Sequence, residues 1–385
     1  MPALPIYLDS QATTPIDPKV VEAMMPYFTN HYGNPASRQH AFGWEARDAV
    51  EHARRQVAEF VDCDPREVCF TSGATEANNL AIKGIVGANK GRHINVVTLA
   101  TEHRAVLDPC RKLEALGVQV TIVSTDRDGL VNLQELERAL TPDTVLISVM
   151  AANNEIGVLQ PIGEISEMAR DRNIVFHSDA VQAVGKVPFS IRKLGVDLIS
   201  LSGHKIYGPK GIGALCFRRR RRTPLDPQMD GGGHERGLRS GTLNVPGIVG
   251  LGCAAAMCQQ NIKSDSARMQ TLRDRLLNGL RKRLDRITVN GSMEHRLPNN
   301  INVSFHGVEG SSLIVGLDDI AVSSGSACTS SHPEPSHVLR AIGIPDEHAR
   351  AALRFGLNRW TSPDEIDYTI EKVTSLVTRL RQVSP

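Results

Sequence analysis

Four short stretches of this sequence carry residue types that could do chemistry, and the first contains a lysine. The run from Asp197 to Ser202 is apolar and β-leaning, it ends at Gly203, and Lys205 follows two residues later. Because ligands of open α/β sheets bind beyond the carboxyl ends of the strands, a lysine placed there can be partly desolvated, with a lowered pKa. Such an amine can form a Schiff base with an aldehyde cofactor. Alone, Lys205 would fit a surface turn better, so the other three stretches decide.

Two of those stretches combine a strand end with a polar turn. In residues 71–78, Thr-Ser-Gly leads into a helix start, where backbone N–H groups and hydroxyls can bind an anion, although an ordinary N-cap looks similar. Asp179 lies just beyond the strand in residues 174–182. The spacing to Lys205 leaves room for one helical crossover and one strand, which places both residues at the same sheet edge. Asp179 could therefore pair with a pyridinium nitrogen, whereas without Lys205 a helix N-cap would be the default.

The fourth stretch is the loop of residues 323–333, which contains Cys328. Small polar residues surround this cysteine, whereas a core cysteine would stand among large apolar residues. An exposed, mobile and free thiol could act as a thiolate nucleophile, and the alternative is an inert surface thiol. The other six cysteines stand in apolar or helical contexts, and we expect them to serve packing.

Alternating strands and helices must position these stretches. The expected strands are 68–71, 94–99, 118–123, 145–150, 174–177, 196–201 and 212–217. The expected helices are 17–28, 44–61, 76–86, 105–116, 133–140 and 162–170. Apolar β-branched runs separated by helices predict a mostly parallel sheet with both faces covered. A helix from Pro246 to the 280s should lead to a second domain, with strands at 300–304 and 320–323 and a final helix capped at 361–365.

Composition narrows the class of protein. The chain has 385 residues, 41% of them apolar, and a net charge of +2, which predicts a large core in two domains and no nucleic-acid or membrane partner. The N-terminus lacks a signal-peptide pattern, and seven cysteines without a CxxC pair predict free thiols in a reducing cytoplasm. We expect no metal site. The arginine run Arg218–Arg222 favours a solvated strand end, with docking of an acidic partner as the alternative.

Three motifs together resemble those of the cysteine desulfurases, within the class-V aminotransferases. They are Ser202–Gly211 (SGHKIYGPKG), Thr71–Glu76 (TSGATE) and Ser323–Ser330 (SSGSACTS), whose long cysteine loop is similar to the NifS/IscS group. The resemblance runs from Leu8 to the final helix. It implies the α/β fold type I of pyridoxal phosphate enzymes, with a mostly parallel seven-stranded sheet flanked by helices and a smaller α+β domain. The implied domains are 15–258 for the large cofactor-binding domain, and 1–14 with 259–385 for the small domain, which carries the catalytic cysteine loop at about 323–335.

The resemblance also implies roles for individual residues. Lys205 would hold pyridoxal 5′-phosphate, and the catalytic set would be Lys205, Cys328 and His103, the last stacking on the ring and moving protons. Asn154 and Arg354 would place the substrate, since a guanidinium suits a carboxylate. The implied cofactor-binding residues are Ala74, Thr75, His103, Asn154, Asp179, Gln182, Ser202, His204, Lys205 and, from the other subunit of a homodimer, Thr242 of the partner subunit.

The implied reaction converts L-cysteine to L-alanine, with a persulfide formed on Cys328 and passed to an acceptor protein. Iron–sulfur cluster assembly, tRNA thiolation and DNA phosphorothioation are all compatible uses of that sulfur, and the sequence does not choose among them. It also does not decide selectivity for cysteine over selenocysteine. An aminotransferase or selenocysteine lyase of the same fold is the enzyme alternative, and the aminotransferase would give Cys328 no role. A partner protein or nucleic-acid-binding module is the non-enzyme alternative, which Lys205 and Cys328 together argue against.

Overall fold

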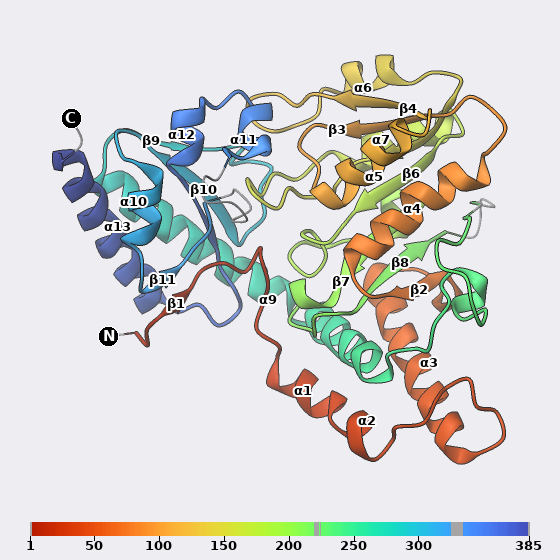
Figure 1. The fold of residues 1–385 in the computed structure, drawn as a ribbon. Coiled ribbons are helices and arrows are strands. Elements are labelled where there is room, and N and C mark those ends of the chain that lie inside the picture. Colours follow the sequence, from red (N-terminus) through yellow and green to blue (C-terminus); the bar gives the residue numbers. More distant parts are fainter. Residues whose placement is uncertain (1, 219–222, 224, 325–333, 384–385) are drawn as a thin grey trace.

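The computed structural model describes residues 2–218, 223, 225–324 and 334–383. Cys328 and the arginines at 219–222, on which two of the sequence predictions fall, lie outside the described residues. A large sheet and two small sheets form the framework, and the N- and C-terminal ends lie on the side of the small sheets (Figure 1).

The large sheet has seven strands in the order β2-β8-β7-β6-β5-β3-β4. They are β2 (Val68–Thr71), β3 (Asn95–Leu99), β4 (Gln119–Val123), β5 (Thr144–Ser148), β6 (Val175–Asp179), β7 (Leu198–Ser202) and β8 (Gly213–Phe217). β8 runs antiparallel to both of its neighbours, and all other neighbouring pairs are parallel. The mostly parallel seven-stranded sheet predicted from the sequence is therefore confirmed.

Helices cover both faces of this sheet because successive strand residues point to opposite sides. Val96 and Leu146 pack with α4 (Ala74–Ala88) and α5 (Arg104–Glu114) on one face. Val97 and Ile147, the next residue on each strand, pack into a second cluster on the other face. The helices of that second cluster are α1 (Pro18–Met24), α3 (Ala41–Val61), α6 (Leu133–Ala139), α7 (Ile162–Asp171), α8 (Ile191–Leu194) and the first half of α9 (Val245–Arg283).

The 39-residue helix α9 connects the large sheet with a separate core around the small sheets (Figure 1). Ile248 and Leu251 belong to the large core, whereas Leu272 and Leu276 belong to the small one. The small sheets contain β9 (Ile287–Val289), β10 (Asn300–Phe305) and β12 (Ala352–Gly356), which are antiparallel, and β1 (Ile6–Tyr7) with β11 (Ile320–Ala321), which are parallel. The helices of this part are α10 (Gly310–Val315), α11 (His337–Ala341), α12 (Asp346–Arg350) and α13 (Pro363–Val383). The domain boundaries expected from the sequence stay a prediction.

Two expected elements differ from the structure. The helix predicted over 17–28 starts as expected, with the Asp17 side chain accepting from the Lys19 N–H, but it is divided into α1 and α2 (Pro26–Thr29). Pro26 lacks the N–H that would continue the helical ladder. The strand predicted over 320–323 ends at Ala321, and the other bounds shift by up to three residues. Within the described chain, no helix combines the length and apolar character needed to span a membrane.

Candidate functional site

A cavity of about 1340 Å³ opens where β6 and β7 end, at the edge of the large sheet that the sequence indicated. The N-terminus of α4, the turn before α5, the N-terminal segment and residues next to β11, α11 and β12 complete its wall. The sequence-predicted residues that line it are Ala74, Thr75, His103, Asn154, Asp179, Gln182, Ser202, His204, Lys205 and Arg354. Thr242 is exposed and does not line this cavity.

Lys205 ends the short 3₁₀ turn η2 (Gly203–Lys205) directly after β7. Its Nζ donates to the carbonyl of Ala12 at 2.8 Å and also to the carbonyl of Gln11. Burial lowers the pKa of Lys205 to about 8, and the positive charge of Arg354 acts in the same direction. Roughly a tenth of this amine is therefore unprotonated at pH 7, far more than for an ordinary lysine, and the unprotonated form is the nucleophile.

Asp179 is the last residue of β6, and its carboxylate is fixed from two sides. Oδ2 accepts from Nδ2 of Asn78 at 2.7 Å, and Oδ1 accepts from the Val181 N–H at 3.1 Å. Since β6 and β7 are parallel neighbours, Asp179 and Lys205 reach the same cavity, as their spacing predicted. The sequence predictions gave Asn78 no role, because its burial and its contact with Asp179 are visible only in the folded chain.

The N-terminus of α4 faces the cavity without a side-chain cap. Gly73 is the N-cap residue and provides no side-chain hydrogen bond, so the first N–H groups of the helix point to where an anion could bind. Glu76 in the first turn would repel an anion, but its carboxylate pairs with Arg239 at 2.7 Å. Burial lowers the pKa of the neighbouring His204 to about 4, and the positive charge of Lys205 acts in the same direction. The His204 ring is therefore neutral at neutral pH.

His103 is the N-cap of α5 and borders the cavity. Nδ1 accepts from the Ala105 N–H at 3.0 Å, so in the neutral ring the proton is on Nε2. Desolvation lowers the pKa of His103; Lys205 lowers it further, whereas Asp179 raises it. Placement at a helix N-terminus also disfavours a cation. The ring therefore offers a neutral Nε2–H donor.

Arg354 in β12 brings the small sheet to the cavity. Nη2 forms an ion pair with Asp9 at 2.7 Å, and Nη1 donates to the main-chain carbonyl of Asn154 at 3.0 Å. The backbone of Arg354 also bonds to Ser323, at the start of the loop that contains Cys328. Ser323 and Glu334, which stand on either side of residues 325–333, both line the cavity.

The residues of this cavity fit pyridoxal phosphate. Lys205 supplies an amine for the aldehyde, Asp179 a carboxylate for the ring nitrogen, and the uncapped α4 N-terminus a place for the phosphate. Asn78, which also lines the cavity, has a buried Oδ1 without a hydrogen-bond partner among the described residues. The described chain holds no cluster of three or more His, Cys, Asp or Glu side chains that could bind a metal ion.

Comparisons with known proteins agree with this geometry. The model of the family described as aminotransferase class-V matches residues 6–369. The chain is 56% identical to a protein of Pectobacterium carotovorum subsp. carotovorum (strain PC1) named cysteine desulfurase IscS, over 99% of this chain and 95% of that protein. It is similar to a solved NifS-like protein, with TM-score 0.91, 38% identity, and coverage of 97% and 100%. It is also similar to a structure titled SspA in complex with cysteine, with TM-score 0.82, 35% identity, and coverage of 93% and 100%.

These similarities extend over nearly the whole chain, and they include the segments that build the cavity. The family match covers most of the chain, and the curated relatives named cysteine desulfurase IscS are more than half identical to it over 99% of its length. The chain belongs to the class-V aminotransferase family and, within it, to the pyridoxal-phosphate-dependent cysteine desulfurases.

Proposed function

We propose that the cavity around Lys205 is where this cysteine desulfurase converts L-cysteine to L-alanine, and that it works as a homodimer. The observation that carries the assignment is that Lys205 and Asp179, at the ends of adjacent parallel strands, face one cavity with Arg354. Pyridoxal phosphate, when bound, supplies an electron sink for bonds broken at the substrate α-carbon. Lys205 and Asp179 hold its aldehyde and ring-nitrogen ends, and Gln182 holds its ring hydroxyl. Ala74, Thr75, Ser202 and His204 surround the phosphate.

Proton transfers are assigned to two side chains with lowered pKa values. Nζ of Lys205, whose pKa is about 8, accepts the proton from the substrate α-carbon. His103 is neutral, and its Nε2–H can hold or pass a proton at the cavity edge. Arg354 and Asn154 orient the substrate, because the guanidinium can bind the α-carboxylate while it stays fixed by Asp9.

Cys328 is assigned the sulfur-transfer step. The positions of Ser323 and Glu334 at the cavity wall support this, because they place both ends of the segment containing Cys328 beside the substrate site. The Cys328 thiolate attacks the substrate sulfur, so a sulfur–sulfur bond forms and the carbon–sulfur bond breaks. The electron pair of the broken bond stays with the β-carbon. Protonation of the β-carbon and return of a proton to the α-carbon give L-alanine. The persulfide on Cys328 is then passed to an acceptor protein for iron–sulfur cluster assembly or another sulfur transfer.

Exposed surface supports the homodimer. The large aromatic side chains Phe28, Tyr32, Phe42 and Trp44 are 47–67% exposed on one N-terminal region. Apolar surface of this kind is typical of a subunit interface. Thr242 is exposed and away from its own cavity, which suits the predicted role of Thr242 of the partner subunit in phosphate binding. Free thiols on the six described cysteines support the predicted reducing cytoplasm.

The test is to incubate the purified holoenzyme with L-cysteine and to measure L-alanine and protein-bound persulfide together. We expect both products from the wild type. Cys328→Ser should keep the Schiff-base absorbance and lose persulfide and most alanine, whereas Lys205→Ala should lose the absorbance itself. Cys253 is a half-buried thiol on α9, so Cys253→Ser is the matched control and should keep both products. A wild type that shows the Schiff-base band but forms no alanine would sink the proposal in favour of an aminotransferase.

A further inference from the structure

The turn that carries Lys205 is fixed on its far side by contacts that the reaction does not use. Five successive main-chain carbonyls in this turn each accept a hydrogen bond from a different donor. Gly203 accepts from the Ile206 and Gly208 N–H groups, His204 from Thr14, Lys205 from Nζ of Lys186, Ile206 from Sγ of Cys258, and Tyr207 from the Asp17 N–H. Lys186 is the one donor in this set that brings a formal charge. The carbonyl of Lys205 itself is therefore held by an ammonium group.

Lys186 is buried at a position where a lysine is costly. Lys186 is 2% exposed. Its Nζ donates to the carbonyl oxygen of Lys205 at 2.7 Å. Among the described residues, this carbonyl is the hydrogen-bond acceptor found for the ammonium of Lys186. The centroid of the Tyr207 ring lies 5.1 Å from the same Nζ. Ser266 of α9 donates to the main-chain carbonyl of Lys186 and so anchors it. A buried ammonium without a carboxylate bonded to it needs a role that compensates for lost hydration.

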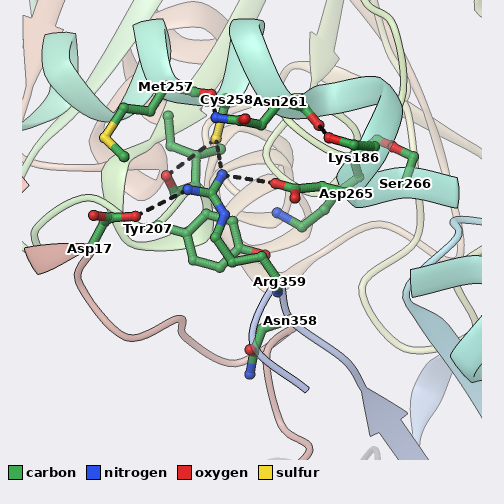
Figure 2. Close-up of polar contacts among 12 residues, drawn as sticks. Asp17, Lys186, Tyr207, Met257, Cys258, Asn261, Asp265, Ser266, Asn358 and Arg359 are labelled. Atoms are coloured by element: carbon green, nitrogen blue, oxygen red, sulfur yellow. Dashed lines mark hydrogen bonds and ion pairs between the residues drawn. The ribbon is translucent and has the colours of Figure 1, made fainter. Parts of the chain in front are cut away.

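Arg359 completes the support behind the turn (Figure 2). Its guanidinium pairs with Asp17 at 3.2 Å and Asp265 at 3.1 Å, and it lies 3.9 Å from the Tyr207 ring centroid. The Arg359 N–H donates to the Tyr207 hydroxyl at 3.0 Å. Tyr207 has φ = 65°, a left-handed conformation that a residue other than glycine keeps only where its surroundings impose it. Arg359 thus holds Tyr207, and Lys186 holds Lys205.

The same placement lets the charge of Lys186 act on the amine of Lys205. The charged groups that face Lys205 are Arg354 from β12, Asp179 from β6, Asp9 from the N-terminal segment and Lys186. Those that face Lys186 are Asp265 from α9 and Arg359, and the Cys258 thiol beside them is neutral because burial raises its pKa. While Lys186 is charged, it favours the free amine of Lys205. Burial lowers the pKa of Lys186 itself to about 8, so this effect fades as the pH rises through that value. One side chain therefore affects both the direction and the protonation of the amine.

We propose that Lys186 is a positioning residue for Lys205, because its buried ammonium holds the Lys205 carbonyl and so fixes how the Lys205 amine enters the cavity. The proposal rests on the role of Lys205 proposed above. Its test uses the full chain freed of cofactor, so that it does not depend on turnover.

The experiment compares Lys186→Met and Lys186→Arg with Lys263→Met, an exposed lysine on α9 that serves as matched control. Two quantities are measured: hydrogen exchange of the amides at 206–208, and the pH midpoint for labelling of the Lys205 amine with acetic anhydride, read by mass spectrometry. We expect Lys186→Met to lose about tenfold of the amide protection, as for one lost hydrogen bond. Its midpoint should move to higher pH because a like charge is gone. Lys186→Arg should restore both quantities, since it keeps a donor and a charge.

Unchanged protection and an unchanged midpoint in Lys186→Met, equal to those of Lys263→Met, would overturn the proposal. If Lys186→Met does not fold, Ser266→Ala replaces it, because this change frees Lys186 from α9 and leaves its ammonium in place. Smaller shifts in the same two directions are then expected, and no shift in either would overturn the proposal. A wild type whose cofactor-free chain labels as expected, but whose holoenzyme forms no alanine from L-cysteine, would instead contradict the proposed function alone.

Discussion

Arg354 and Arg359 follow each other closely in the sequence, and each pairs with an aspartate of the N-terminal segment, yet they serve opposite sides of the Lys205 turn. Arg354 pairs with Asp9 at 2.7 Å on the cavity side, and its other partner is a main-chain carbonyl. Arg359 pairs with Asp17 behind the turn and has a second carboxylate, Asp265, at 3.1 Å. Nε of both arginines is without a partner among the described residues, so the contrast lies in the carboxylates.

The difference shows how one arginine stays available for the substrate while the other stabilises the structure. Arg359 is neutralised by two carboxylates and covered by the Tyr207 ring, so nothing about it favours another anion. Arg354 has one carboxylate and lines the cavity. The α-carboxylate of L-cysteine would give Arg354 the second anionic partner that Arg359 already has.

The largest effect is expected from Arg359→Leu. Removing this guanidinium leaves Asp17 and Asp265 without their shared cation, and both carboxylates are mostly buried. We expect the free energy of unfolding to fall by about 3–5 kcal/mol, as for a buried ion pair that loses one partner. Urea unfolding of the wild type and the variant measures it.

The matched control is Arg275→Leu, because Arg275 also pairs with an aspartate, Asp367, but on the surface. Exposed pairs contribute little to stability, so this variant should unfold close to the wild type. Equal unfolding curves for the two leucine variants would break the comparison, because Arg359 would then be no more structural than a surface arginine.

The second effect tests the other half of the comparison through Arg354→Lys. A lysine keeps the charge but cannot bind a carboxylate with two parallel hydrogen bonds. We expect kcat/KM for L-cysteine to fall by roughly 10- to 100-fold, mainly through KM, as for the loss of a charge-assisted hydrogen bond. Steady-state alanine formation measures it, and the loss in unfolding free energy should be smaller than for Arg359→Leu.

Cysteamine, which is L-cysteine without the carboxylate, separates this role from a general disturbance of the cavity. Its slower turnover should be nearly the same in the wild type and in Arg354→Lys, because it has no carboxylate for the guanidinium to bind. An equal loss for both substrates would mean that Arg354 acts on the cavity rather than on the substrate.

The cavity side of the Lys205 turn could be predicted from the sequence, because local sequence patterns indicate it. Asp179 and Lys205 stand at strand ends, and the spacing between them fixed the sheet edge on which they meet. The parallel sheet was predictable for the same reason, since buried strands are near-continuous apolar runs. The resemblance added His103, Asn154 and Arg354, which no local pattern would have placed in the cavity.

The support on the other side of this turn, from Lys186 and Arg359, could not be predicted in this way. Lys186 and Lys205 bond across 19 positions, and Arg359 and Asp17 across 342, so no periodicity of the chain relates them. Asn78 was missed although it lies in a quoted motif, because only the fold shows that it reaches Asp179. The roles of Thr242 and Cys328 stay predictions, and Cys328 lies outside the described residues.

The smallest effect concerns Glu155, which decides whether Arg354 really has one carboxylate fewer than Arg359. Glu155 is 5% exposed, and burial raises its pKa to about 7, although Ser336 and Arg354 act in the opposite direction. Below that pH the group is neutral, and its oxygen accepts from the Ser336 hydroxyl. An ionised Glu155 would instead give Arg354 a second anionic neighbour.

The protonation state of Glu155 can be measured from the pH dependence of the unfolding free energy, by comparing the wild type with Glu155→Gln. Between the ordinary value of 4.5 and about 7, the folded chain binds more protons at Glu155 than the unfolded chain does. The contribution of this group to stability is therefore fully present below the lower pH and is lost as pH rises through the window. Since glutamine does not titrate, the stability of the wild type relative to Glu155→Gln should fall between about pH 5 and about pH 7 and then level off.

Glu309→Gln is the control for that titration, because hydrogen bonds from Ser311 and Ser312 lower the pKa of Glu309 to about 2. Its stability contribution is lost only as pH falls below the ordinary value, so the difference from the wild type should stay constant over about pH 5 to 8. A constant difference for Glu155→Gln as well would show that Glu155 is ionised throughout. Arg354 would then have two carboxylate neighbours, as Arg359 has, and its availability for the substrate would need another explanation.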